Sequence, residues 1–264
     1  MTYHAFDVGK FRCVVVPDGR SELPAMEIAA VFPPEYRDEI LASQPAREFD
    51  LNCLLVESED QLILFDTGKG TLDPDHSPQL LTNLSEAGVT PADIDIVVLT
   101  HGHGDHIGGV VDDAGRLAFP QARHLMTRLD WDYWVGPALR PSSERCLFPL
   151  RDSITFIQPD DLIAPGVRAL AAPGHTPGHI GAAIESQGEM LIHVVDAIHH
   201  SVQMAHPGWS PRFDVDPVVS AQTRRALLER AATERCTLMA YHFGFPGLGT
   251  VRAQGEGFVF APVA

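Results

Sequence analysis

Seven short runs of apolar residues are spread along the chain, and each ends close to a glycine, an aspartate or a histidine. Runs this short, bounded by turn-forming residues, are typical of buried β-strands rather than of helices. They cover residues 11–16, 51–56, 62–65, 94–99, 167–171, 191–195 and 238–241. The pattern therefore predicts strands distributed over the whole length of the chain.

Helical patterns fall between some of these strands. Ser77 and Pro78 form an N-cap and first-turn signal, the leucines at positions 80, 81 and 84 share a face, and Gly88 provides a stop. Asp216 and Pro217 open a second helix in the same way. The core face of that helix is expected to carry Val219, Ala226, Leu227 and Ala231, and its solvent face Arg224, Arg225 and Glu229. Strands and helices thus mix along the chain, which indicates an α/β fold.

Two segments, 17–47 and 129–165, interrupt this rhythm. Both are rich in proline and aromatic residues and lack a clean period. We expect them to be insertions or covering loops within a single domain that spans residues 1–264. In each half of the chain, strands end in aspartate or histidine residues, which indicates two similar halves, each with a sheet, that face each other.

Composition places the chain among globular proteins and narrows its partners. Of its 264 residues 45% are hydrophobic and 20% charged, and the formal net charge is −16. Such a charge repels phosphate backbones and anionic lipid head groups, so neither nucleic acid nor a membrane is an expected partner. The first ten residues lack the pattern of an export signal. The four cysteines stand singly, which favours reduced thiols and a cytoplasmic location.

The segment 96–109 carries the strongest chemical signal. An apolar strand leads into the hexapeptide His-Gly-His-Gly-Asp-His at positions 101–106. Gly102 and Gly104 let the backbone turn sharply enough to aim the three imidazoles and the carboxylate together. Imidazole and carboxylate are the ligands of zinc and similar divalent cations, so the pattern indicates a metal site rather than a solvated loop.

Three further candidate ligands follow apolar runs elsewhere in the chain. His175 comes after one such run, Asp196 after the next, and His242 after the last. Side chains at strand ends lie where loops build the sites of α/β proteins. The chain can therefore supply a second set of ligands for the same site.

This combination of residues resembles the metallo-β-lactamase superfamily, and the resemblance extends from Asp66-Thr67-Gly68 to His242. It implies an αββα four-layer sandwich, in which two mixed β-sheets are flanked by helices. It also implies two divalent cations per chain, with zinc as the first choice and manganese, iron or cobalt as alternatives that the same ligands accept.

The resemblance also assigns roles to single residues. Asp66 would be hydrogen-bonded to a ligating imidazole and fix its tautomer. Asp196 would bridge the two cations. The remaining ligands would be His101, His103 and His175 for the first cation, and Asp105, His106 and His242 for the second.

Within the superfamily, the sequence most resembles the methyl-parathion-hydrolase-like enzymes and the N-acyl homoserine lactonases, through residues 129–134, 196–200 and 240–249. This implies a hydrolase of lactones or esters, aryl esters included, whose nucleophile is a hydroxide shared by the two cations. It leaves room for a phosphotriesterase side activity. Asp105 would also carry a proton to the leaving group. His199 stands where the homoserine lactonases have a tyrosine and would donate a hydrogen bond to the substrate carbonyl.

The second irregular segment supplies the expected substrate pocket. Trp131, Trp134 and Phe148 would form apolar walls for an aryl or acyl group, unless these side chains only anchor the segment to the core. Three alternatives stay open: a thioesterase of the glyoxalase II type, an N-acyl homoserine lactonase, and a metal-binding scaffold without turnover. The sequence leaves the oligomeric state open, a homodimer included.

Overall fold

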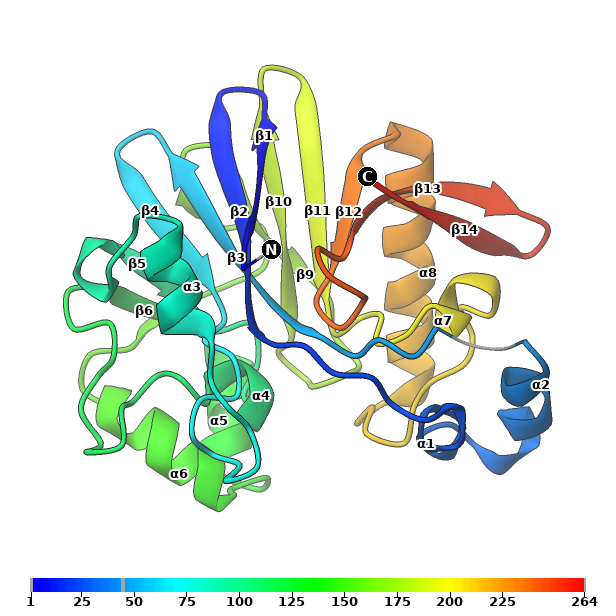
Figure 1. Cartoon of the computed structure of the whole chain (residues 1–264), viewed down its shortest axis with the longest axis horizontal. Helices are drawn as coiled ribbons and strands as arrows, with labels where there is room; N and C mark the ends of the chain where they lie inside the picture. Colours follow the sequence, from blue (N-terminus) through cyan, green and yellow to red (C-terminus); the bar gives the residue numbers. More distant parts are fainter. Residues whose placement is uncertain (1, 44–45, 264) are drawn as a thin grey trace.

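The computed structural model describes residues 2–43 and 46–263, and two seven-stranded β-sheets form its centre (Figure 1). The N-terminal sheet has its strands in chain order: β1 (His4–Val8), β2 (Phe11–Gly19), β3 (Leu51–Ser58), β4 (Gln61–Phe65), β5 (Ile96–Val98), β6 (Arg123–Thr127) and β7 (Thr155–Ile157). The C-terminal sheet consists of β8 (Leu162–Ala164), β9 (Val167–Ala171), β10 (Ile180–Ser186), β11 (Glu189–Val195), β12 (Thr237–Ala240), β13 (Leu248–Gln254) and β14 (Gly257–Pro262). Both sheets are mixed, because β4 to β7 run parallel in the first, and β11 and β12 in the second.

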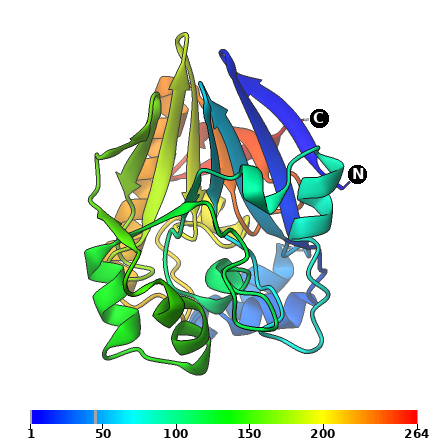
Figure 2. The same cartoon turned by 90° about the vertical axis from the view of Figure 1, so that its left-hand side faces the viewer.

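Helices cover the outer sides of the two sheets. Beside the N-terminal sheet lie α3 (Leu80–Glu86), η2 (Pro91–Asp93), α4 (Gly104–Ile107), α5 (Arg128–Val135), α6 (Pro141–Leu147) and η3 (Phe148–Leu150). Beside the C-terminal sheet lie α7 (Val202–Ala205), α8 (Pro217–Glu234) and, from the start of the chain, α1 (Ala25–Ala30), η1 (Pro34–Tyr36) and α2 (Arg37–Ala42). In the view turned by 90° the two sheets face each other with helices on both flanks (Figure 2). This arrangement confirms the predicted αββα sandwich.

Three apolar cores explain why the strand sequences are apolar without alternation. In β3, Leu54 and Val56 belong to the core between the sheets, whereas Cys53 and Leu55 belong to the core under α3. A third core, around Leu228, lies between the C-terminal sheet and α8. A strand that is covered on both faces has no side that favours polar residues.

Two helices differ in detail from the prediction. α3 begins at Leu80 rather than at Ser77, because Asp18 accepts the N–H of Leu80 at 3.0 Å and thus caps the helix from another part of the chain. α8 keeps its predicted cap, Asp216. The predicted faces of α8 are partly wrong, since Arg224 is fully buried and Ala226 is exposed.

The two irregular segments have different roles. The first, 17–47, holds α1 and α2, and Phe32 packs there with Trp209 in a small core of its own. The second, 129–165, is not a covering loop. It holds α6, most of α5, β7 and β8, and it carries the chain from the edge of one sheet to the edge of the other. That residues 1–264 form a single domain stays a prediction.

Two observations bear on the predictions made from composition. Within residues 2–43 and 46–263, no helix combines the length and apolar character needed to cross a membrane. The four cysteines are buried and unpaired.

Candidate metal centre

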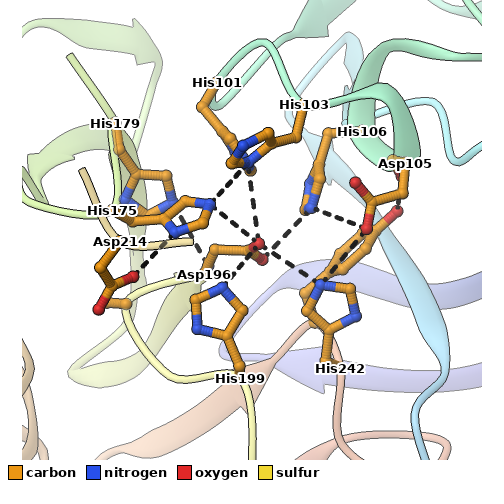
Figure 3. A network of polar contacts seen from close by, with 12 residues as sticks. His101, His103, Asp105, His106, His175, His179, Asp196, His199, Asp214 and His242 are labelled. Atoms are coloured by element: carbon orange, nitrogen blue, oxygen red, sulfur yellow. Dashed lines mark hydrogen bonds and ion pairs between the residues drawn. The ribbon is translucent and has the colours of Figure 1, made fainter. Parts of the chain in front are cut away.

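The candidate ligands meet at one edge of the sandwich, where strands of both sheets end (Figure 3). His101 and His103 follow β5, and α4 places Asp105 and His106 in its only turn. The turn between the first two histidines needs a glycine, because a Cβ at Gly102 would overlap the indole of Trp134. The C-terminal sheet contributes the other three candidate ligands, His175, Asp196 and His242, from the loops after β9, β11 and β12.

Three imidazoles form the first donor set, defined as His101, His103 and His175. The Nε2 of His101 lies 2.9 Å from the Nδ1 of His103, which in turn lies 2.8 Å from the Nε2 of His175. The triangle closes with 3.2 Å between the Nε2 atoms of His101 and His175. The Oδ2 of Asp196 lies 3.4 Å from the Nε2 of His175.

The second donor set consists of Asp105, His106 and His242. The Oδ2 of Asp105 lies 3.9 Å from the Nε2 of His106 and 3.7 Å from that of His242. Asp196 reaches this set as well, with its Oδ1 at 3.3 Å from the Nε2 of His106 and its Oδ2 at 3.4 Å from the Nε2 of His242. The carboxylate of Asp196 therefore lies between the two sets, and all seven predicted ligands come together.

Acceptors behind the rings fix which nitrogen of each imidazole faces the centre. The Nδ1 of His106 lies 2.8 Å from the Oδ2 of Asp66, and that of His175 lies 3.0 Å from the Oδ1 of Asp214. The Nδ1 of His242 lies 3.1 Å from a backbone carbonyl, that of Asp50. Carboxylate and carbonyl oxygens only accept, so each Nδ1 donates its proton and each Nε2 presents a lone pair to the centre.

Burial keeps the first donor set neutral. Desolvation lowers the pKa of His101 and His175 well below the ordinary value, and it lowers that of His103 to about 4. Asp196 is affected in the opposite sense: burial alone would raise its pKa, but the surrounding imidazoles, His106 first, hold it well below the ordinary value. The first donor set is therefore uncharged at neutral pH, whereas Asp196 is ionised. His106 differs: burial alone would lower its pKa, but the carboxylates of Asp196, Asp66 and Asp105 hold it well above the ordinary value, so a cation at its Nε2 would take the place of a proton.

This arrangement fits a pair of divalent cations. The hydroxyl of Thr100 donates to Asp66 and so accepts the Nδ1 proton of His101 at 3.2 Å. The Nε2 lone pairs of His101 and His175 then lie only 3.2 Å apart with no proton between them, an arrangement that a cation would stabilise. In the same cluster, the Nε2 of His106 and the Oδ1 of Asp196 are buried without a hydrogen-bond partner. Imidazole and carboxylate donors of this kind suit zinc and similar cations.

His179 belongs to the support of the centre. Its Nδ1 donates to the carbonyl of Ala172 at 2.7 Å, and its Nε2 accepts the backbone N–H of Asp196 at 3.3 Å. Both ring nitrogens are therefore used, and the imidazole orients Asp196 rather than facing the centre.

His199 lies at the open side of the centre. Its Nε2 is 3.2 Å from the Oδ2 of Asp196, and among the described residues neither ring nitrogen has a hydrogen-bond partner. The Oε1 of Gln203 accepts its backbone N–H at 2.8 Å and fixes the loop. With Phe49 and Phe213, His199 lines a cavity of about 280 Å³ that reaches both donor sets.

A second cavity of about 230 Å³ continues from the first and is almost entirely apolar. The two cavities share Phe49, His199 and Phe213. The remaining walls come from the N-terminal segment and the loop after β11: Leu23, Ile28, Val31, Phe32 and His200.

The aromatic side chains predicted to form the pocket lie elsewhere. Trp131 packs in the core under the N-terminal sheet, with its ring 5.9 Å from that of Phe156. Trp134 is buried against the first donor set, 4.8 Å from the ring of His103, and supports that residue from behind. Phe148, half-buried in η3, lines neither cavity. The apolar walls come instead from the first irregular segment and from Phe213.

Several residues of the site escape sequence reasoning. Asp50 acts through a backbone carbonyl, which no sequence pattern reveals. Phe49 stacks on His242 with ring centroids 4.1 Å apart. Asp214 stands two residues before a helix cap, and the apolar-then-acidic pair Phe213-Asp214 is its only signal.

A sequence profile described as "Metallo-beta-lactamase superfamily" matches residues 46–235, well over half of the chain. The chain belongs to the metallo-β-lactamase superfamily. A protein of Mycobacterium tuberculosis named "Probable metallo-hydrolase" is 30% identical over 181 residues, 56% of this chain and 57% of that relative. The N-acyl homoserine lactonase AttM of Azorhizobium caulinodans is 31% identical over 166 residues, 57% of this chain and 59% of that relative.

The chain thus spans less than two thirds of the length of these relatives. The similarity to a solved structure is more extensive. AidC, described as a dizinc quorum-quenching lactonase in complex with a product, superposes with a TM-score of 0.86 at 27% identity. The superposition covers 99% of this chain and 97% of that one.

The two donor sets predict that each chain binds two equivalents of Zn²⁺. Metal analysis of zinc-loaded protein after dialysis against metal-free buffer measures this number. Asp196→Ala removes the carboxylate that lies between the sets, so its metal content should fall below two. His76→Ala changes a histidine outside the centre and should keep both equivalents. One equivalent in the wild type, or two in Asp196→Ala, would contradict the two-cation centre.

Proposed function

We propose that the protein is a dinuclear zinc hydrolase that opens lactones and cleaves related esters with apolar acyl or aryl groups. One observation carries the proposal: two sets of lone-pair donors joined by Asp196 open directly onto an apolar cavity. The similarity to AidC and to the lactonase AttM supports it. Zinc is the proposed metal, although the same donors accept manganese, iron and cobalt.

When bound, two such cations supply an activated water and polarise the substrate carbonyl. The protein provides their donors, and no cysteine is exposed to compete as a nucleophile, because all four are buried. His101, His103 and His175 would hold one cation, and Asp105, His106 and His242 the other. Asp196 would contact both.

Asp105 has a second proposed role in moving a proton. Its side chain is 32% exposed and faces the cavity, so substrate can reach it. Desolvation by the surrounding protein alone would raise the pKa of Asp105, but the neighbouring His106 and His242 hold that pKa below the ordinary value. The ionised carboxylate can accept a proton and return it to the leaving group.

His199 is the proposed hydrogen-bond donor to the substrate carbonyl. It combines two unpaired ring nitrogens with a place in the wall of both cavities. A donor that is already positioned stabilises the charge that develops on the carbonyl oxygen without reorganisation.

The walls of the second cavity favour an apolar group next to the reacting carbonyl. Leu23, Ile28, Val31 and Phe32 offer no charge to a bound ligand. This lining suits an acyl chain or an aryl ring better than the charged glutathione moiety of a glyoxalase II substrate. An apolar cavity beside a complete donor set favours an enzyme that binds a substrate there over a metal-binding scaffold without turnover.

A substrate panel with zinc-loaded protein tests the proposal, and His199→Phe tests the proposed donor. Aryl and alkanoyl lactones and esters should turn over faster than glutathione thioesters or β-lactams, and an aryl phosphotriester should turn over slowly. His199→Phe should lower kcat on the lactones by about 10- to 1000-fold and keep both zinc ions, because only the donor is lost. Preference for a thioester or β-lactam would contradict the substrate class. A variant with wild-type kcat would exclude the donor role.

Narrowing the apolar cavity should change substrate preference. Val31→Phe adds bulk to the wall of the second cavity, so KM for long-chain or aryl substrates should rise several-fold while kcat for short-chain esters stays near the wild-type value. Met26→Phe, at an exposed position of α1, the helix that ends just before Val31, serves as the matched control. Equal effects of both variants, or no effect of Val31→Phe, would show that the acyl group binds elsewhere.

A further inference from the structure

His175 is held from behind by the segment that leads into α8. The Oδ1 of Asp214 lies 3.0 Å from its Nδ1, and the Asp214 side chain has no exposed surface. The second oxygen of Asp214 lies 3.2 Å from the guanidinium of Arg224. A chain of three buried groups thus runs from the first donor set into the middle of α8.

Burial of the Arg224 guanidinium is tolerated because each of its N–H groups donates to an acceptor. Besides Asp214, it donates to Ser220 Oγ at 2.9 Å and to three backbone carbonyls: Ala197 at 2.7 Å, Pro207 at 2.7 Å and Trp209 at 3.1 Å. Ala197 directly follows Asp196. One side chain of α8 therefore fixes both the support of His175 and the strand end that carries Asp196.

The backbone around His175 is attached to the same helix. The N–H of Val215 donates to the carbonyl of His175 at 3.0 Å, and the hydroxyl of Thr223 donates to that of Pro173 at 2.8 Å. Gly174 has a φ of +120°, and a Cβ there would overlap the backbone nitrogen of Ser220. The loop and the start of α8 are packed too closely to move independently.

We infer that Asp214, held in place by Arg224, is a positioning residue for the first donor set alone. By accepting the Nδ1 proton of His175, Asp214 leaves only the Nε2 lone pair for a cation. The second donor set has its own device in Asp66, which holds His106 in the same way. The two carboxylates serve different cations. This inference rests on the proposed two-cation centre.

The test compares Asp214→Asn with Asp66→Asn, because both substitutions keep the size of the side chain and remove one charge. Cadmium-loaded protein gives one ¹¹³Cd NMR signal per bound ion, and competition with a chelator gives two stepwise affinities. Loss of such a support weakens metal binding by about 10- to 100-fold. Asp214→Asn should therefore weaken and shift one ion, and Asp66→Asn should weaken and shift the other.

Asp214→Asn leaves Arg224 as a buried charge without its partner, which can disturb folding. The double variant Asp214→Asn with Arg224→Gln removes both charges but also the bonds of Arg224 to the carbonyls of Ala197, Pro207 and Trp209. Compared with Arg224→Gln alone, which shares that loss, the double variant should further weaken only the ion of the first donor set. Thermal unfolding of the metal-free proteins measures stability separately. A merely structural salt bridge would lower stability and weaken both ions equally, or neither.

The outcomes separate this inference from the proposed function. A wild-type protein that binds only one cadmium ion would overturn the two-cation centre, and the inference with it. A wild type that binds two ions, with both affinities unchanged in Asp214→Asn, would overturn the inference alone. Weakening of the same ion by Asp214→Asn and Asp66→Asn would also overturn it.

Discussion

The hydrogen bond from a ring nitrogen to an acceptor behind it is the interaction on which the centre depends. His106, His175 and His242 each donate Nδ1–H to an oxygen that cannot donate back. Each ring is thereby limited to one tautomer and one orientation, and its remaining lone pair faces the centre. Without these acceptors either nitrogen of a neutral ring could carry the proton, and the lone pair would not be directed at the centre.

The sandwich fold makes this arrangement possible. Each donor set takes its ligands from loops of both sheets. The apolar core between the sheets holds these strand ends next to each other. Two residues at this edge of the sandwich have a positive φ although neither is a glycine. Asp66 has a φ of 62° and Val195, just before Asp196, a φ of 49°. Such conformations cost about 1–3 kcal/mol each and persist only where neighbouring contacts hold them.

Local patterns in the sequence were sufficient to predict the strands at the site and the seven candidate ligands, because these residues stand at strand ends in short motifs. The support for the ligands was not predictable in the same way. Arg224 is charged and lies on a helix, so the helical pattern predicts that its side chain is exposed to solvent. In the structure it is buried, because three backbone carbonyls from other parts of the chain accept its hydrogen bonds. Trp134 is predicted to line the substrate pocket, but it lies behind His103 and lines neither cavity. Such contacts depend on chain segments that are far apart in the sequence.

The most direct test identifies the state of both ring nitrogens in each candidate ligand. Long-range ¹H–¹⁵N correlation spectra of zinc-loaded protein with labelled histidine separate protonated from metal-bound nitrogen. The account predicts a protonated Nδ1 and a bound Nε2 at His101, His106, His175 and His242, and the reverse at His103. Binding of zinc through Nδ1 at His106 or His175, or two protonated nitrogens on either ring, would contradict it.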